Sequence, residues 1–90
     1  MQTDLIKEFE KFGDIYKLLE AKTTISVRRL KKHYLKLARI WHPDKNKAAN
    51  AAEVFKKIKH GYDILKNPEK REKYDMYLRM LRSKRERIFE

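Results

Sequence analysis

The chain has 90 residues, of which 41% are charged, and it contains only two glycines and two prolines. This length allows one small domain, and its core has no spare volume for a deep cofactor pocket. The absence of cysteine excludes disulfide frameworks and thiolate zinc sites and fits a reducing compartment. The formal net charge of +11 favours an acidic partner, which can be nucleic acid, anionic lipid or an acidic protein face.

Residues 1–12 form an N-terminal extension that mixes acidic and basic residues with apolar ones, which is unlike a signal peptide. No apolar run in the chain approaches the roughly 20 residues that span a bilayer. We therefore expect a cytoplasmic or nuclear protein. One more short amphipathic helix is expected in this extension, packed on the body of the domain through Leu5, Ile6, Phe9 and Phe12.

The first breaker is Gly13, and a short apolar segment, Ile15 to Leu19, follows it. This segment is long enough for about one and a half helical turns. Asp14 is the expected N-cap, because its carboxylate can accept a hydrogen bond from a free backbone N–H of the first turn.

The clearest amphipathic helix begins after a group of capping residues at 23–26, of which Thr24 is the favoured N-cap. Its apolar face consists of Val27, Leu30, Tyr34, Leu37, Ala38 and Trp41. The opposite side is basic and consists of Arg28, Lys31, Lys32, Lys36 and Arg39. Arg28 and Arg29 oppose the helix dipole, so a binding partner would explain them. The alternative is a solvated face.

His42-Pro43 ends this helix, because proline disfavours helical backbone before it and has no N–H. A polar loop runs to about Asn50, where the sequence to Glu53 reads as a capping box. A second apolar face follows at helical spacing, made of Val54, Phe55, Ile58, Tyr62 and Leu65. Asn67-Pro68 ends this helix, so the two helices are expected to form an antiparallel hairpin.

From Glu69 the chain is almost continuously charged, with a thin apolar stripe of Tyr74, Tyr77, Leu78 and Leu81. We expect a further helix here, which residues 83–90 either extend or fray. The predicted fold is all-α. The predicted core is Ile15, Leu18, Leu19, Leu30, Tyr34, Leu37, Phe55, Ile58, Tyr62 and Leu65.

Several motifs, in the right order and spacing, cover most of the chain from Gly13 to Asp75. They are Asp14-Ile15-Tyr16-Lys17-Leu18-Leu19, Leu30 to Ala38, Trp41-His42-Pro43-Asp44-Lys45-Asn46, Phe55-Lys56-Lys57-Ile58, Asn67-Pro68 and Tyr74-Asp75. Together these motifs resemble the J-domain of the DnaJ-type co-chaperone family. The resemblance implies a helical hairpin of the second and third helices with short flanking helices, and it assigns residues 13–76 to the J-domain. Residues 77–90 are then a basic helical extension or the start of a following region.

The resemblance also implies a function. In the family, the His-Pro-Asp loop and the basic face of the second helix dock on a DnaK-type heat-shock chaperone and stimulate its ATP hydrolysis. The partner-binding residues carried over to this chain are His42, Pro43, Asp44, Lys31, Lys32, Lys36, Arg28, Arg39 and Tyr34. Asp44 either pairs with an arginine of the partner or holds the loop, and Tyr34 either packs on the helix pair or lies at the contact edge. The ATP belongs to the chaperone, so no cofactor and no metal are expected.

Three departures from the family pattern have expected consequences. Gly61 stands where alanine is usual and is expected to loosen its helix, at a cost of about 1 kcal/mol. Leu35 replaces a residue that is often basic, which weakens the contact with the chaperone. Arg28 and Arg29 stand where acids are common. The sequence lacks a Gly/Phe-rich segment and a cysteine-rich zinc module, and we expect a monomer that forms the front of a longer protein, with the client chosen by other regions.

Two other classes of function were weighed. Basic helices with aromatic residues fit nucleic-acid binding, and the basic segment of Arg79, Arg82, Lys84, Arg85 and Arg87 is the best candidate for it. An enzyme is not expected, because no glycine-rich phosphate loop and no nucleophile beside His42 are present. Pro43 is also expected to splay the side chains of His42 and Asp44 apart.

Overall fold

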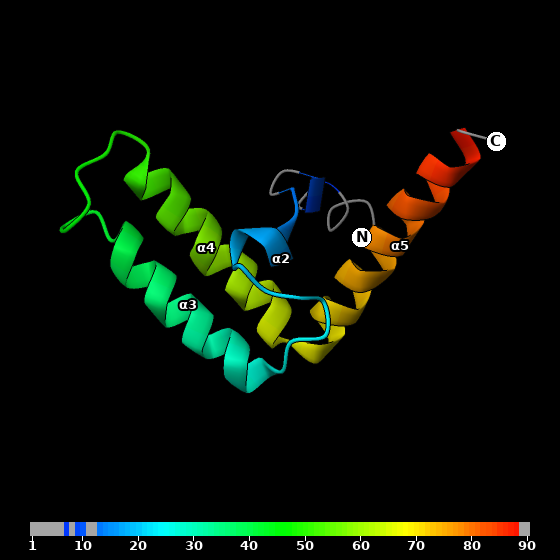
Figure 1. The fold of residues 1–90 in the computed structure, drawn as a ribbon, viewed down its shortest axis with the longest axis horizontal. Helices are drawn as coiled ribbons and strands as arrows, with labels where there is room; N and C mark the ends of the chain where they lie inside the picture. Colours follow the sequence, from blue (N-terminus) through cyan, green and yellow to red (C-terminus); the bar gives the residue numbers. More distant parts are fainter. Residues whose placement is uncertain (1–6, 8, 11–12, 89–90) are drawn as a thin grey trace.

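The computed structural model of the protein describes residues 7, 9–10 and 13–88, and this part of the chain is helical with no strand. It contains α2 (Ile15–Leu18), α3 (Val27–Trp41), α4 (Ala51–Lys66) and α5 (Pro68–Ile88). The all-α prediction is therefore confirmed. Helices α3 and α4 form the predicted antiparallel hairpin, α5 leaves the end of α4 at an angle, and α2 lies between α4 and α5 (Figure 1). None of the described helices is long and apolar enough to cross a membrane.

Helix α2 is a single turn whose two ends are closed by local hydrogen bonds. The carboxylate of Asp14 accepts from the backbone N–H of Lys17 at 3.1 Å, which confirms the predicted N-cap. At the other end Glu20 has a left-handed φ of 54°, and the N–H of Ala21 donates to the carbonyl of Tyr16 at 2.8 Å. This Schellman closure stops the helix after one turn, earlier than the sequence predicted.

The helix starts of α3 and α4 both differ from the prediction. Ser26, not Thr24, caps α3, because its backbone is extended and its hydroxyl accepts from the N–H of Arg29 at 3.2 Å. Asn50 is the N-cap of α4, but its side chain makes no capping hydrogen bond, so the predicted capping box is wrong. The cause is local: the backbone of Asn50, at φ −98° and ψ 4°, is not in the extended region that aims a cap side chain at the first turn.

The core of the described part lies where α2, α3, α4 and α5 meet. Six predicted core residues are fully or almost fully buried: Ile15, Leu19, Leu30, Leu37, Ile58 and Leu65. Leu18, Tyr34 and Tyr62 pack against this cluster while partly exposed. Phe55 is a correction, because it is half-buried outside the cluster. Five further residues are buried that the predicted core did not include, namely Phe9, Tyr16, Ala51, Ile64 and Tyr74.

Residues 7, 9 and 10 are the described part of the N-terminal extension, and all three are helical, as the sequence predicted. Phe9 is the buried one among them. Its ring is buried and lies edge-on to Tyr74, with the ring centroids 5.0 Å apart. The other three residues named for that helix, Leu5, Ile6 and Phe12, lie outside the described residues.

The structure gives Gly61 a packing role, because its missing side chain lets α2 approach α4 closely. A Cβ placed on Gly61 would lie 2.8 Å from Cγ2 of Ile15, a side chain with no exposed surface. Any side chain at this position would therefore push α2 away from α4. The low helix propensity of glycine is offset by this close packing.

Two tyrosines fix α5 against the N-terminal part of the domain. The hydroxyl of Tyr74 accepts from the N–H of Ile15 at 2.8 Å and donates to the carbonyl of Gly13 at 3.1 Å. The hydroxyl of Tyr16 donates to Asp75 at 2.6 Å. Burial is the main cause that raises the pKa of each tyrosine to about 12, and for Tyr16 the hydrogen bond to Asp75 adds to it.

Arg71 completes this attachment. Its Nη2 atom donates to the carbonyls of Thr23 at 3.0 Å and Ile25 at 2.6 Å, and its Nε atom donates to the hydroxyl of Tyr16 at 3.1 Å. One guanidinium thus joins α5, α2 and the loop before α3. Charged donors of this kind make stronger hydrogen bonds than neutral ones.

Candidate functional site

The loop between α3 and α4 begins with a tight turn built by His42. The carbonyl of His42 accepts from the backbone N–H groups of Lys45 at 3.0 Å and Asn46 at 2.8 Å. Pro43 fixes one φ angle inside this turn. The turn therefore presents His42, Pro43 and Asp44 as a defined surface, and all three are exposed at one end of the helical hairpin.

Asn46 fastens the loop to α3 and was not among the predicted site residues. Its side-chain amide donates to the carbonyl of Ile40 at 3.1 Å, and its Oδ1 accepts from the N–H of Ala48 at 3.0 Å. The first bond satisfies a carbonyl at the end of α3 that has no partner within the helix. The only signal in the sequence was the place of Asn46 at the end of the His-Pro-Asp motif.

The side chains of His42 and Asp44 lie close together, so the prediction that Pro43 splays them apart is wrong. Nδ1 of His42 accepts from the backbone N–H of Asp44 at 3.2 Å and lies 3.7 Å from Oδ2 of the same residue. The turn folds back through the carbonyl of His42, which brings the two side chains to one side. The backbone bond uses the lone pair on Nδ1, which places the proton of the neutral imidazole on Nε2.

The ring of His42 also has an aromatic support. Phe55, on the first turns of α4, meets it edge-on with the ring centroids 5.2 Å apart. This contact explains why Phe55 is only half-buried: it lies under the loop instead of in the core. Phe55 thus limits the positions that the imidazole of His42 can take. The helical spacing of Phe55 in the sequence did not predict this contact.

The predicted basic side chains all lie on the outer face of α3. Arg28, Lys31, Lys32, Lys36 and Arg39 are each exposed. We call these five residues the basic strip. Arg28 and Arg39 are eleven residues apart, so the strip is about 16 Å long and ends within one turn of the loop. Leu35 lies within the strip and is 43% exposed, so it interrupts the positive charge.

Tyr34 lies at the edge of the basic strip, on the side that faces α4. Its ring stacks on that of Tyr62 with the centroids 4.2 Å apart and the planes 5° apart. Nζ of Lys66 lies 5.5 Å from the centroid of the Tyr62 ring. Tyr34 therefore packs on the helix pair and remains partly exposed beside the strip.

The site consists of an exposed turn and a cationic helix face. In the described part of the chain, no group of three or more His, Asp or Glu side chains is placed to hold a metal ion. An exposed turn beside a charged helix face suits contact with another macromolecule, whereas small-molecule sites are concave. The fold is thus all-α, and the site has the geometry of a contact surface for another macromolecule.

The DnaJ domain family model matches residues 14–75, which is more than half of the chain. The chain is 45% identical over 75 residues to DnaJ homolog subfamily B member 14 of Xenopus tropicalis, which covers 83% of the chain and 20% of that protein. It is 52% identical over 64 residues to DnaJ homolog subfamily C member 16 of Pongo abelii, covering 71% of the chain and 8% of that protein. The chain is also 47% identical over 64 residues to the Chaperone protein DnaJ of Brevibacillus choshinensis, covering 71% of the chain and 17% of that protein.

The chain belongs to the DnaJ-domain family. It spans a fifth or less of the length of the three relatives compared. The matched region contains the loop and both helices of the hairpin. Membership of this family supports a co-chaperone role beside a DnaK-type chaperone.

Proposed function

We propose that this domain docks on a DnaK-type heat-shock chaperone through His42, Pro43, Asp44 and the basic strip, and stimulates ATP hydrolysis by that chaperone. The observation that carries the proposal is the exposed, internally hydrogen-bonded turn at the end of the basic strip. The nucleotide and the catalytic groups belong to the chaperone, and the domain itself binds no cofactor. This function is binding and regulation, not catalysis.

The rigidity of the loop supports docking. Pro43, the two bonds to the carbonyl of His42 and the side chain of Asn46 hold the turn before a partner arrives. A surface that is ordered in the free protein loses less conformational entropy on binding. Asp44 has a side chain that is 89% exposed, so its carboxylate is free to pair with an arginine of the chaperone.

The basic strip supports the same partner. Exposed cations that face an acidic surface raise the rate of encounter and fix the orientation of the complex. In this proposal the strip steers the approach, and the loop makes the contact that changes the chaperone. Tyr34 lies at the edge of that contact.

The test is single-turnover ATP hydrolysis by a DnaK-type chaperone, with the domain, with its His42→Gln variant and without either. We expect the domain to raise the rate at least tenfold and the variant to have little effect. His60→Gln is the matched control, because it makes the same chemical change on α4 away from the loop. Circular dichroism checks that all versions are folded. If the domain does not raise the rate with chaperones from several compartments, the proposal is wrong.

The compartment and the oligomeric state remain predictions from the sequence. A cytoplasmic or nuclear location would place the domain beside the chaperones of those compartments, and a fluorescent fusion to the whole protein would test it. Sedimentation analysis of the domain would test the expected monomer.

A further inference from the structure

The charge of α5 changes along the helix. Residues 68–75 carry three acidic and three basic side chains, and they are the part of α5 that holds the domain together through Arg71 and Tyr74. Residues 79–88 carry five basic residues and one acidic residue. We call residues 79–88 the distal segment. The docking function proposed above uses none of it.

The distal segment extends away from the helical hairpin, at the end of the molecule opposite the loop (Figure 1). Every residue from Arg79 to Lys84 is exposed. Among the described side chains, neither salt bridge involves Arg79, Arg82 or Lys84. These cations are thus available to an external anion.

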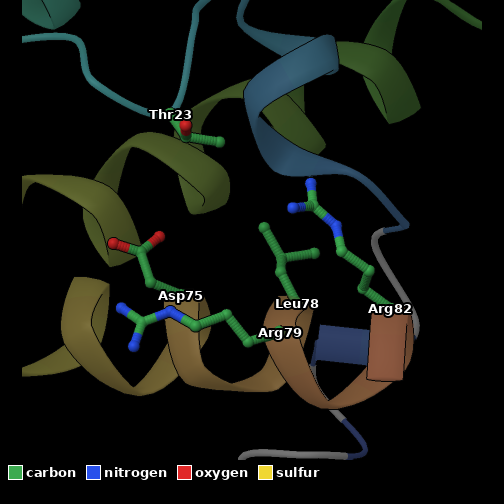
Figure 2. Close-up of a pocket in the computed structure, with 5 residues that line it drawn as sticks. All are labelled: Thr23, Asp75, Leu78, Arg79 and Arg82. Atoms are coloured by element: carbon green, nitrogen blue, oxygen red, sulfur yellow. The ribbon is translucent and has the colours of Figure 1, made fainter. Parts of the chain in front are cut away.

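A shallow cavity of about 390 Å³ lies at the base of the distal segment, lined by Thr23, Asp75, Leu78, Arg79 and Arg82. Figure 2 shows that the side chains of Arg79 and Arg82 diverge, with Arg79 on the side of Asp75 and Arg82 on the far side of Leu78. The carboxylate of Asp75 is held by the hydroxyl of Tyr16 and adds negative charge to the cavity. Two diverging guanidinium groups suit separate anions spaced along a polymer better than one small anion.

The distribution of side chains favours a nucleic-acid duplex among polyanions. Arg79 and Lys84 are five residues apart, about 140° around the helix, so the cations are not confined to one face. A helix that lies on a membrane needs a continuous apolar face, but in the distal segment Lys84 lies between Met80 and Leu81 around the helix and interrupts the apolar surface. Residues 79–88 contain no aromatic residue, so stacking on the bases of a single strand has no platform there.

We propose that the distal segment binds the phosphate backbone of a nucleic-acid duplex without reading its sequence. The ten residues span about 15 Å, and a duplex carries one phosphate per roughly 1.7 Å of its axis, so several phosphates lie within reach. The loop with His42 lies at the other end of the domain (Figure 1). The duplex and the partner of the loop can therefore be bound at the same time.

The test measures fluorescence anisotropy of a labelled 20-base-pair duplex, in RNA and DNA forms, with the whole chain at several salt concentrations. The Arg79→Gln/Arg82→Gln variant is expected to bind about tenfold more weakly at low salt. The slope of log affinity against log salt should decrease in magnitude by about 2, since two phosphate contacts are lost. Arg28→Gln/Arg29→Gln on α3 removes the same charge and should change both quantities much less.

Each alternative result overturns the proposal. Equal losses in the two variants would mean that net charge alone attracts the duplex. A tighter complex with single strands than with duplex, or binding to vesicles that contain phosphatidylserine but not to duplex, would assign the segment to another partner. The Arg79→Gln/Arg82→Gln variant should stimulate the chaperone ATPase as much as the unmodified domain does. The ATPase assay therefore tests the docking function independently of duplex binding.

Discussion

At Gly61 a missing side chain sets the distance between two helices. The place for its Cβ is already taken by Ile15, which is fully buried and has no free space to move into. Helix propensity alone would predict that glycine at this position destabilises α4. We expect the steric overlap to be the larger effect, because overpacking a dense core typically costs about 1–3 kcal/mol, whereas the propensity difference is about 1 kcal/mol.

Gly61→Ala should therefore destabilise the domain by about 1–3 kcal/mol, although alanine is the better helix former. Urea unfolding followed by circular dichroism measures the change. In the double variant with Ile15→Leu, which removes the overlapping Cγ2 atom, part of the loss should be recovered. A stabilised Gly61→Ala variant would show that α2 moves at no cost.

Residues whose contacts depend on the local path of the turns and the loop could not be predicted from the sequence. Ser26 and Thr24 are equally good caps by type, and only the turn at 22–25 decides between them. Phe55 has a helical spacing that fits the core, but the loop it supports covers it instead. Asn46 makes its bonds only when the turn exists.

At the scale of elements, the apolar periodicity of α3 and α4 predicted the hairpin because both helices bury one face against each other. The same periodicity placed the basic strip on the outer face of α3. It did not predict how α5 is attached, because Tyr74 and Arg71 bond to residues 46 or more positions away. The His-Pro-Asp motif also identified the loop, but the hydrogen bonds within the loop are visible only in the structure.

The outer face of α3 offers one direct change of charge. Leu35 is 43% exposed and lies within the basic strip. Leu35→Arg should make the strip continuous and raise the affinity for the ATP-bound chaperone about two- to fivefold, mainly through faster association at low salt. Biolayer interferometry at two salt concentrations measures the affinity and the association rate.

Leu35→Gln is the control for this experiment, because it removes the apolar surface without adding charge. Its affinity should stay within a factor of two of the unmodified domain. If the glutamine and arginine variants behave alike, charge at this position does not contribute to docking.

At the scale of the whole molecule, stability should depend on alkaline pH through two tyrosines. The pKa of Tyr16 and of Tyr74 is raised to about 12, above the ordinary value of 10.0. Both groups stabilise the fold fully below pH 10, where folded and unfolded chains carry the same protons. This contribution is lost as the pH rises toward 12, because the unfolded chain releases its phenolic protons first.

Urea unfolding at pH 9, 10 and 11 tests this dependence. The free energy of unfolding should fall between pH 10 and 11, and the Tyr16→Phe variant should show a shallower fall. Lysine deprotonation affects both proteins equally and cancels in the comparison. Parallel curves would contradict the assigned role of Tyr16.

The domain divides its charge between two ends. The loop lies at one end of the longest axis, α3 runs from the middle of the molecule to this loop, and the distal segment of α5 projects at the other end (Figure 1). The buried tyrosines and Arg71 hold α5 in this direction. A rigid frame thus separates the surface proposed for the chaperone from the surface proposed for a duplex.

The most direct test of docking is an NMR titration of the isotope-labelled domain with an ATP-bound DnaK-type chaperone. Backbone amide signals of His42, of residues 44–46 and of Arg28, Lys32, Leu35 and Arg39 should shift or broaden first, while signals of residues 79–88 stay unchanged. His42→Gln should remove the changes in the loop and weaken those on α3. Changes that centre on α5 or on the exposed face of α4, with residues 42–46 unaffected, would contradict the account.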